Sequence, residues 1–169
     1  MPKNVFITGP LGVGKTTIIK HLIKDLKPLI IRGFYKERII DNQICKGFRI
    51  ITLDFREQVL AHIHFEGPDR IGEYGINIEG FENLVLPELE TIDNVELFII
   101  DEISDMECLS KKFCKKVLQI LESDIPMIAT LSLSEIPEIG NFRNRKDVSL
   151  LKVTHKNRDS LWKKILLEI

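Results

Sequence analysis

The sequence predicts an α/β protein in which a largely parallel β-sheet is covered by helices on both faces. Two observations carry this prediction: short, wholly apolar segments typical of buried strands, and amphipathic helices that alternate with them along the chain. A third observation is the two-residue apolar period between residues 29 and 65. This period predicts an antiparallel β-meander inserted into the parallel framework.

The first half of the chain opens with a strand at Asn4–Thr8, a glycine-rich turn and an amphipathic helix that ends near Lys27, because Pro28 follows. The meander comes next, with a turn at residues 41–43. Its expected strands are Leu29–Arg32, Phe34–Ile40, Phe48–Leu53 and Val59–Phe65. A helix is expected over Glu79–Glu90, where Pro87 should introduce a kink or start a new helix.

The second half begins with the apolar strand Leu97–Ile100, which ends in two carboxylates. Ser110 is expected to cap a helix, and Asp159 to cap a last helix that carries Leu161 and Ile165. Two further strands are expected between these helices, at Ile125–Leu131 and Val148–Val153. Because no repeat or flexible linker interrupts the pattern, we expect a single domain over residues 1–169.

Composition excludes several classes of protein. The 169 residues carry 24 Lys plus Arg against 25 Asp plus Glu. The chain therefore lacks the overall basic charge that would indicate nucleic-acid binding. Three cysteines without CxxC spacing fit neither a disulfide framework nor a zinc site, and they predict reduced thiols in the cytoplasm. No apolar run approaches the length of a membrane span. We therefore expect a soluble cytoplasmic protein without a membrane partner; the composition identifies no protein partner.

The charges are unevenly distributed although they nearly cancel. Both ends of the chain are basic, and residues 66–107 are acidic. One interpretation is that these blocks are solvated faces of opposite charge. The other is that the basic ends converge on a polyphosphate ligand and attract it electrostatically.

Residues 9–16 carry the most specific motif in the chain. They read Gly-Pro-Leu-Gly-Val-Gly-Lys-Thr, which fits GxxxxGK[ST] at every fixed position, and they lie between a predicted strand and a predicted helix. Glycines let the backbone N–H groups curl around phosphate oxygens at the positive end of the helix. Lys15 is expected to reach the β- and γ-phosphates, and the Thr16 hydroxyl to bind Mg²⁺.

A second motif is the acidic pair Asp101 and Glu102 at the end of an apolar strand. By itself such a pair is not specific, because buried strands commonly end in acidic residues where they reach solvent. In a chain with a phosphate loop, Asp101 is expected to hold Mg²⁺ beside Thr16. Glu102 is then free to orient or activate the water that attacks the γ-phosphate.

The predicted site combines the glycine-rich loop with the strand that carries the two carboxylates. The predicted nucleotide-binding residues are Gly9, Pro10, Leu11, Gly12, Val13, Gly14, Lys15, Thr16, Thr17, Leu97, Phe98, Ile99, Ile100, Asp101, Glu102, Ile103 and Ser104. The predicted catalytic residues are Lys15, Glu102 and Arg158, and the predicted Mg²⁺ ligands are Thr16 and Asp101.

Several further motifs occur in a characteristic order along nearly the whole chain. They are Gly33-Phe34 with Glu37 and Arg38, Lys46-Gly47-Phe48, Gly72-Glu73-Tyr74-Gly75-Ile76-Asn77-Ile78-Glu79, Asp101-Glu102-Ile103 with Met106-Glu107, and Asn157-Arg158-Asp159. In this order the chain resembles the small nucleoside-triphosphatase family of thermophilic prokaryotes, whose animal member is called cancer-related nucleoside-triphosphatase. The resemblance implies a three-layer, RecA-like P-loop fold with an additional strand. It also implies Mg²⁺-dependent hydrolysis of ATP, GTP, CTP, UTP and TTP to diphosphates, with low base selectivity.

The chain departs from that family after the carboxylate pair. The family usually reads Ile-Gly-Lys-Met-Glu, whereas residues 103–107 read Ile-Ser-Asp-Met-Glu. Asp105 thus replaces a lysine that would add positive charge near the phosphates. Leu11 replaces the second proline of the family's loop, where only the backbone is expected to contact phosphate.

Charge that develops during phosphoryl transfer calls for a cation besides Lys15 and the metal. Arg38, Arg143, Arg145 and Arg158 are candidates, and Arg158 is the first choice because it lies in a family-like motif. Thr130, at the end of an expected strand, either senses the γ-phosphate or is an ordinary strand-end hydroxyl.

Two other functions share the phosphate loop with an NTP hydrolase. One is a nucleoside or nucleotide kinase, in which an arginine-rich lid closes over an acceptor; the absence of arginine from residues 108–140 argues against it. The other is a slow nucleotide-dependent switch that binds a protein or RNA. Glu102 directly after Asp101 favours hydrolysis.

Overall fold

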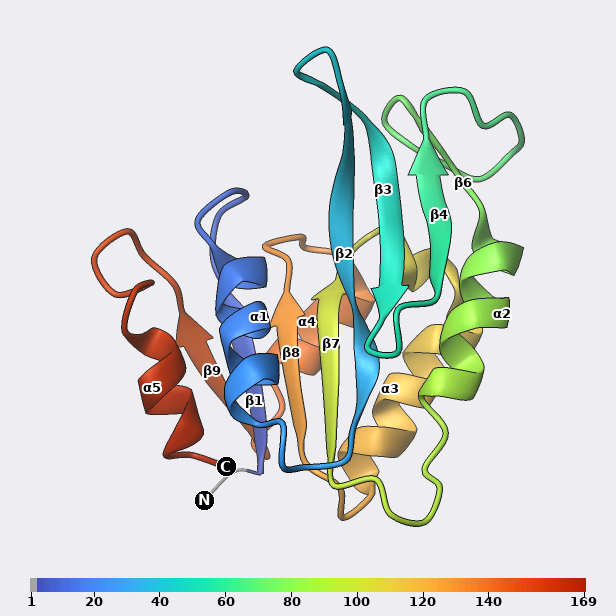
Figure 1. Ribbon diagram of the computed structural model, residues 1–169. Coiled ribbons are helices and arrows are strands. Elements are labelled where there is room, and N and C mark those ends of the chain that lie inside the picture. Colours follow the sequence, from blue (N-terminus) through green and yellow to red (C-terminus); the bar gives the residue numbers. More distant parts are fainter. Residues whose placement is uncertain (1–2) are drawn as a thin grey trace.

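One nine-stranded sheet forms the centre of the computed structural model, which describes residues 3–169 (Figure 1). Its strand order is β5-β6-β4-β3-β2-β7-β8-β1-β9. The strands are β1 Asn4–Thr8, β2 Ile31–Asp41, β3 Ile44–Thr52, β4 Glu57–His62, β5 Arg70–Ile71, β6 Tyr74–Ile76, β7 Leu97–Ile103, β8 Met127–Leu131 and β9 Val148–Lys152. The helices are α1 Lys15–Asp25, α2 Ile78–Glu88, α3 Lys111–Glu122, α4 Pro137–Arg143 and α5 Leu161–Leu166, with a 3-10 turn η1 at Glu107–Leu109.

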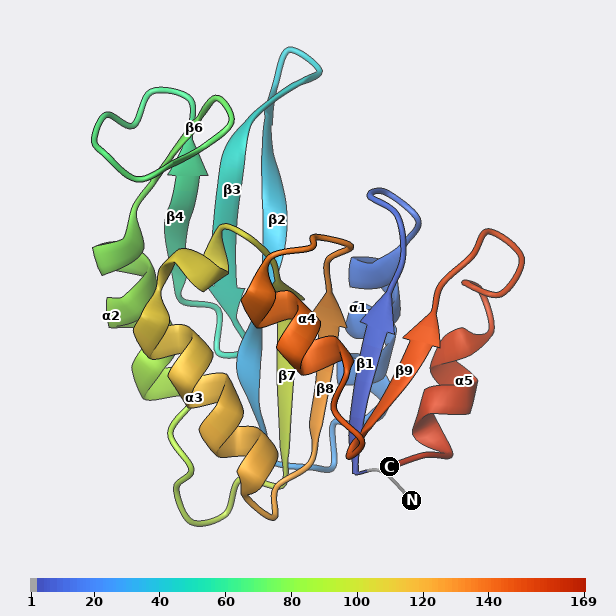
Figure 2. The same ribbon diagram turned by 180° about the vertical axis from the view of Figure 1, so that it is seen from behind.

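The parallel half of the sheet consists of β2, β7, β8, β1 and β9. Its strands are buried on both faces because alternate side chains enter two separate cores. Leu97 and Ile99 of β7 pack in the core beneath α1 and α5, whereas Phe98 and Ile100 pack in the core beneath α2, α3 and α4. Figures 1 and 2 show these two helical layers on opposite faces of the sheet. The three-layer α/β prediction is confirmed.

The antiparallel half extends the sheet from β2 through β3, β4, β6 and β5. The β2–β3 hairpin turns at Asn42 and Gln43, whose positive φ angles of 47° and 65° suit a tight hairpin turn. It rises beyond the ends of the neighbouring parallel strands (Figure 1). This hairpin and β4 form the meander that the sequence predicts.

Gly33 lies in β2 at the point where the two halves meet. Its φ is +136°, and a Cβ at this position would stand 1.8 Å from the carbonyl oxygen of Ile99 on β7. Only glycine fits such a close approach. The expected strands Leu29–Arg32 and Phe34–Ile40 are therefore one continuous strand that pairs with β7 at its start and with β3 further on.

Several expected boundaries are wrong. Pro87 does not start a new helix, because α2 continues through it and ends at the next residue, where the Leu89 N–H donates to the Val85 carbonyl. Asp159 does not cap the last helix; the N-cap is Ser160, and the Asp159 side chain is 92% exposed. Helix α4 was not predicted, since only Ile139 and Phe142 of its seven residues are buried.

Other expectations hold. Ser110 caps α3, where its hydroxyl accepts a hydrogen bond from the Phe113 N–H at 3.0 Å. Among residues 3–169, no helix combines the length and the apolar composition that crossing a bilayer requires.

Candidate active site

The glycine-rich loop joins β1 to α1 at the edge of the sheet where the parallel strands end. Gly12 and Gly14 have φ angles of 77° and 111°, which other residues rarely adopt. Helix α1 begins directly afterwards at Lys15, and its first turn contains no acidic residue. The free N–H groups at this helix end and in the loop therefore remain available to an anion.

Lys15 is folded back over the loop. Its Nζ donates to the carbonyl oxygen of Gly9 at 2.8 Å and to that of Pro10 at 3.3 Å, and it lies 3.9 Å from Oε2 of Glu102. The ammonium group is thus placed above the loop, within reach of any phosphate that the N–H groups bind. Lys15 itself is only 8% exposed.

Asp101 is the most buried carboxylate next to the loop, with 1% of its surface exposed. Two hydroxyl groups donate to its oxygens: Thr16 Oγ1 to Oδ2 at 2.7 Å, and Thr130 Oγ1 to Oδ1 at 2.5 Å. Burial raises the pKa of Asp101 to about 6, although both hydrogen bonds oppose the rise. The structure thus brings the two predicted metal ligands, Thr16 and Asp101, into direct contact.

The Thr16–Asp101 pair fits a Mg²⁺ ion by its chemistry. Hydroxyl and carboxylate oxygens are hard donors, and Mg²⁺ commonly takes only one or two protein ligands and completes its shell with water and phosphate oxygens. Across residues 3–169 no group of three or more His, Cys, Asp or Glu side chains could hold a metal ion. The donor set therefore suits Mg²⁺ bound together with a nucleotide rather than a metal held by protein alone.

Glu102 lies between two lysines. Its Oε1 is 3.2 Å from Nζ of Lys36 on β2, and its Oε2 faces Lys15. Lys36 also lies 2.8 Å from Oε1 of Glu107, a carboxylate with no exposed surface. Burial disfavours the ammonium form, yet the carboxylates of Glu107 and Glu102 outweigh that effect and raise the pKa of Lys36 above its ordinary value.

These groups open into one cavity of about 810 Å³, the size of a small-molecule site. The phosphate loop, the Asp101–Glu102 pair and the base of the β2–β3 hairpin form its walls. The lining residues from outside the loop and the acidic pair are Thr17, Lys36, Glu37, Arg38, Phe48, Ile71, Ser104, Asp105, Met106, Ser132 and Ser134. The cavity is thus built by both halves of the sheet.

Comparisons with known proteins agree with this geometry. A model of the family described as NTPase matches residues 4–166. The chain belongs to this NTPase family. It is 40% identical to the nucleoside-triphosphatase THEP1 of Thermotoga maritima, over 96% of this chain and 92% of that protein. It is 35% identical to the human cancer-related nucleoside-triphosphatase, over 95% of this chain and 93% of that protein.

A solved structure supports the same assignment. The crystal structure of THEP1 from Aquifex aeolicus superposes with a TM-score of 0.89 at 33% identity and covers 97% of each chain. These findings confirm the family resemblance, the P-loop fold and the assignment of the chain to the NTPase enzymes.

Some predicted nucleotide-binding residues do not reach the cavity of this NTPase. Leu97, Phe98, Ile99 and Ile100 have no exposed surface and fill the two cores. Val13 and Ile103 are also buried and do not line the cavity. The side chains of these residues therefore pack in the cores; the β7 residues carry Asp101 and Glu102 to the edge of the sheet, and Val13 can contribute only its backbone N–H to the phosphate loop.

The candidate arginines separate into three groups. Arg38 is exposed and lines the cavity. Arg158 lies beside the loop, with its Cδ 3.6 Å from the place that a Cβ on Gly14 would take, but it does not line the cavity. Arg143 donates to the carbonyls of Ser132 and Ser134, and Arg145 makes two hydrogen bonds to Asp147. The last two therefore have structural partners.

Sequence reasoning missed Lys36 and Glu107 as parts of the site. Neither belongs to a nucleotide-binding motif, and they come together only through the pairing of β2 with β7. A signal was nevertheless present for Glu107, which belongs to one of the motifs that carry the family resemblance, whereas Lys36 lies in the charged run Lys36-Glu37-Arg38 and does not stand out. Thr130, expected either to sense the γ-phosphate or to be an ordinary strand-end hydroxyl, is fully buried. Its hydroxyl donates a hydrogen bond to Asp101 and so supports that carboxylate.

Proposed function

We propose that this chain is a Mg²⁺-dependent hydrolase that converts nucleoside triphosphates to nucleoside diphosphates and inorganic phosphate in a single domain. The observation that carries the proposal is the convergence of Lys15, Thr16, Asp101 and Glu102 in one cavity. These side chains supply a phosphate-binding cation, two oxygen ligands and a carboxylate beside the phosphate site. The relatives named above are called nucleoside-triphosphatases, which supports the same reaction.

The reaction follows from the placement of these groups. The loop N–H groups and Lys15 bind the β- and γ-phosphates and hold the γ-phosphorus near Glu102. When bound at Thr16 and Asp101, Mg²⁺ would neutralise charge on the phosphate oxygens. Glu102 accepts a hydrogen bond from a water whose oxygen bonds to the γ-phosphorus, while the bond to the β–γ bridging oxygen breaks. The water proton passes to Glu102 and then to solvent.

Low base selectivity is part of the proposal. The groups described above address the triphosphate and the metal, and the family resemblance implies that ATP, GTP, CTP, UTP and TTP are all substrates. Arg158, beside Gly14, is the proposed catalytic arginine, and Arg38 is the alternative inside the cavity.

We place the reaction in the cytoplasm, since Cys45, Cys108 and Cys114 are all free thiols. Cell fractionation tests this location.

The test of the proposed function is phosphate release from ATP, GTP, CTP and UTP with Mg²⁺ and no added acceptor. The native protein is expected to hydrolyse all four. Glu102→Gln should bind nucleotide normally and turn it over about 10²–10⁴-fold more slowly, because a water-activating carboxylate is lost. Glu122→Gln, an exposed glutamate at the end of α3, is the matched control and should have native activity.

Two outcomes would contradict the proposal. Nucleotide binding without phosphate release would move the assignment to a kinase that needs an acceptor, or to a switch that needs a partner. Hydrolysis that continues at the native rate in Glu102→Gln would remove the water-activating role from Glu102.

A further inference from the structure

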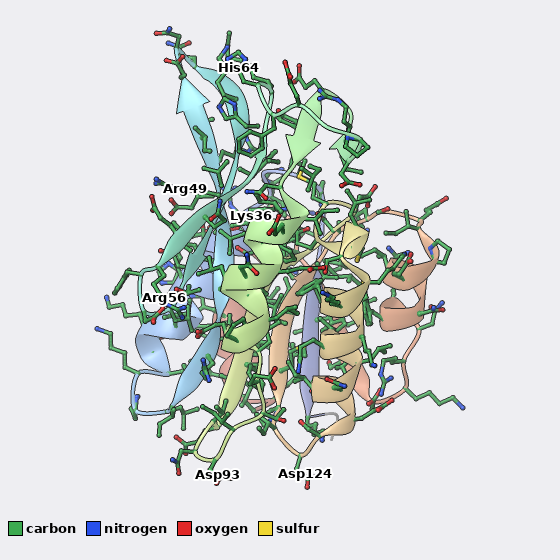
Figure 3. The ribbon with its side chains drawn as sticks, turned by 90° about the vertical axis from the view of Figure 1, so that its right-hand side faces the viewer. Lys36, Arg49, Arg56, His64, Asp93 and Asp124 are labelled. Carbon is green, nitrogen blue, oxygen red and sulfur yellow. The ribbon has the colours of Figure 1, made fainter. Side chains whose placement is uncertain are left out.

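Lys36 is the most unusual charged residue in the described part of the β2–β3 hairpin. Its side chain is only 11% exposed, whereas those of Arg49 and Arg56 are 40% and 49% exposed. Figure 3 shows Lys36 towards the centre of the molecule, with the two arginines nearer its margin. A lysine buried to this extent is rare unless its ammonium group is paired.

The ammonium group of Lys36 has three polar partners. Its Nζ lies 3.2 Å from Oε1 of Glu102 and 2.8 Å from Oε1 of Glu107, and it donates to Oγ of Ser104 at 3.2 Å. The ring of Phe48 lies over it, with the ring centroid 5.5 Å from Nζ. Limited access to water strengthens each of these electrostatic contacts.

Glu107 holds the ammonium group through one of its two carboxylate oxygens. Its Oε2 accepts hydrogen bonds from the Ser104 N–H and the Ser104 hydroxyl, so the carboxylate is held by its own turn of chain. Its Oε1 is then directed at Lys36. The carboxylate of Glu107 is therefore paired with Lys36, and Glu107 is not among the residues that line the cavity.

The contacts of Glu102 differ between its two oxygens. Oε1 faces Lys36 at 3.2 Å, and Oε2 faces Lys15 at 3.9 Å, on the side of the phosphate loop. A carboxylate held at one oxygen by a fixed cation presents the other oxygen in a defined direction. In this structure that direction is towards the place where the γ-phosphate would bind.

We propose that Lys36 is a positioning residue for hydrolysis: it holds Oε1 of Glu102 so that Oε2 receives the attacking water. The inference rests on the proposed function, because it takes Glu102 as the water-activating group. Lys36 lines the same cavity, but its ammonium group is engaged by Glu102, Glu107 and Ser104, and the described residues show no hydrogen bond between it and the phosphate loop. Its effect therefore falls on turnover rather than on nucleotide binding.

Nucleotide binding makes this role more important. Lys15, which now donates to the carbonyls of Gly9 and Pro10, is needed at the phosphates once a nucleotide occupies the loop. Lys36 is then the cation that remains on Glu102. Without it, Oε1 is no longer held, and the carboxylate can rotate so that Oε2 turns away from the water.

The test is a set of substitutions assayed for ATP binding, KM and kcat with saturating Mg²⁺. Lys36→Met should lower kcat about 10- to 100-fold, as expected for a misplaced catalytic group, with KM changed less than about threefold. Lys36→Arg keeps the charge and should recover most of the activity. Lys116→Met removes a lysine of α3 that pairs with Glu90; neither residue lines the cavity, so this variant is the matched control with native kcat.

The decisive measurement is a double-mutant cycle with Glu102→Gln. If Lys36 acts through Glu102, adding Lys36→Met to Glu102→Gln should cause no further loss in the residual rate, followed with γ-labelled ATP. An equal loss in both backgrounds would overturn the proposal, because Lys36 would then act independently of Glu102. A native kcat in Lys36→Met would also overturn it.

Lys36→Met leaves Glu107 buried without its partner, which can prevent folding. The variant Lys36→Met/Glu107→Gln removes both charges and provides the same test in a neutral environment. A melting curve confirms that each variant is folded. The two proposals fail separately: a native rate in Glu102→Gln counts against the proposed function, whereas native kcat in the Lys36 variants beside an inactive Glu102→Gln counts against the role of Lys36 alone.

Discussion

The two halves of the sheet contribute different kinds of groups to the cavity. The parallel half supplies backbone N–H groups from the loop after β1, Lys15 and Thr16 from the start of α1, and Asp101 from β7. The antiparallel half supplies side chains from within a strand, including Lys36, Glu37 and Arg38 of β2. In the proposed function, the first set binds phosphate and metal. The second set includes Lys36, which pairs with Glu102 of β7, so the proposed chemistry depends on both halves of the sheet whereas binding depends mainly on the parallel half.

The largest effect is expected where the two halves join. Gly33→Ala places a Cβ 1.8 Å from the Ile99 carbonyl at a φ of +136°, so it should lower the free energy of unfolding by about 4 kcal/mol through strain and overpacking. Urea unfolding followed by circular dichroism measures this loss. The control is Gly140→Ala in α4, where an added Cβ meets nothing within 4 Å and helix propensity favours alanine. If Gly33→Ala unfolded at the same urea concentration as the native protein, the junction would tolerate a side chain.

A smaller effect is expected within the parallel half. Thr130→Val removes the hydroxyl that donates to Oδ1 of Asp101 at 2.5 Å, while leaving the direct ligands in place. The Mg²⁺ concentration for half-maximal turnover should rise about tenfold, because a support of a metal ligand is lost. Thr130→Ser keeps the hydroxyl and should have the native Mg²⁺ requirement. Equal Mg²⁺ titrations for Thr130→Val and the native protein would contradict a role for Thr130 in metal binding.

The smallest effect is expected at Asp105, which lines the cavity from the loop after β7. Asp105→Lys changes a negative charge near the phosphates into a positive one, so it should lower KM for ATP about two- to fivefold, the range for a partly exposed charge pair. Asp105→Asn should give part of this change. The difference should disappear in high salt, which screens exposed charges. If KM rises in Asp105→Lys, or if the difference in KM from the native protein does not depend on salt, the charge at position 105 does not act electrostatically on the phosphates.

Motifs that work through the backbone could be predicted from the sequence. Residues 9–16 fix both their own conformation and their position before a helix, and the apolar run 97–100 brings Asp101 to the edge of the sheet. Local signals gave Ser110 as a cap for the same reason, since a cap depends on residues three positions away. The residue type alone did not decide between Asp159 and Ser160, because the packing of Leu161 and Ile165 sets where α5 begins.

The parts that could not be predicted depend on contacts between distant segments. Lys36 meets Glu102 and Glu107 only because β2 pairs with β7, about seventy positions further along the sequence. The side chains of Leu97–Ile100 were assigned to the nucleotide because the motif continues through them, although a strand buried on both faces cannot expose them. Motifs therefore predicted which segments form the site, and strand pairing determined which side chains face it.

The position of β1 between β8 and β9 has a consequence for the order of assembly. Asn4 pairs with Met127 on one side and with Val148 on the other, whereas β2 and β3 are joined by a tight turn and pair at once. On a ribosome, the hairpin can therefore form while most of the chain is still to be made. The glycine-rich loop emerges well before β8 and β9, and the strand that precedes the loop stays without neighbours until residues 127–152 have followed. Nucleotide-binding competence therefore has to wait for the synthesis of both strands.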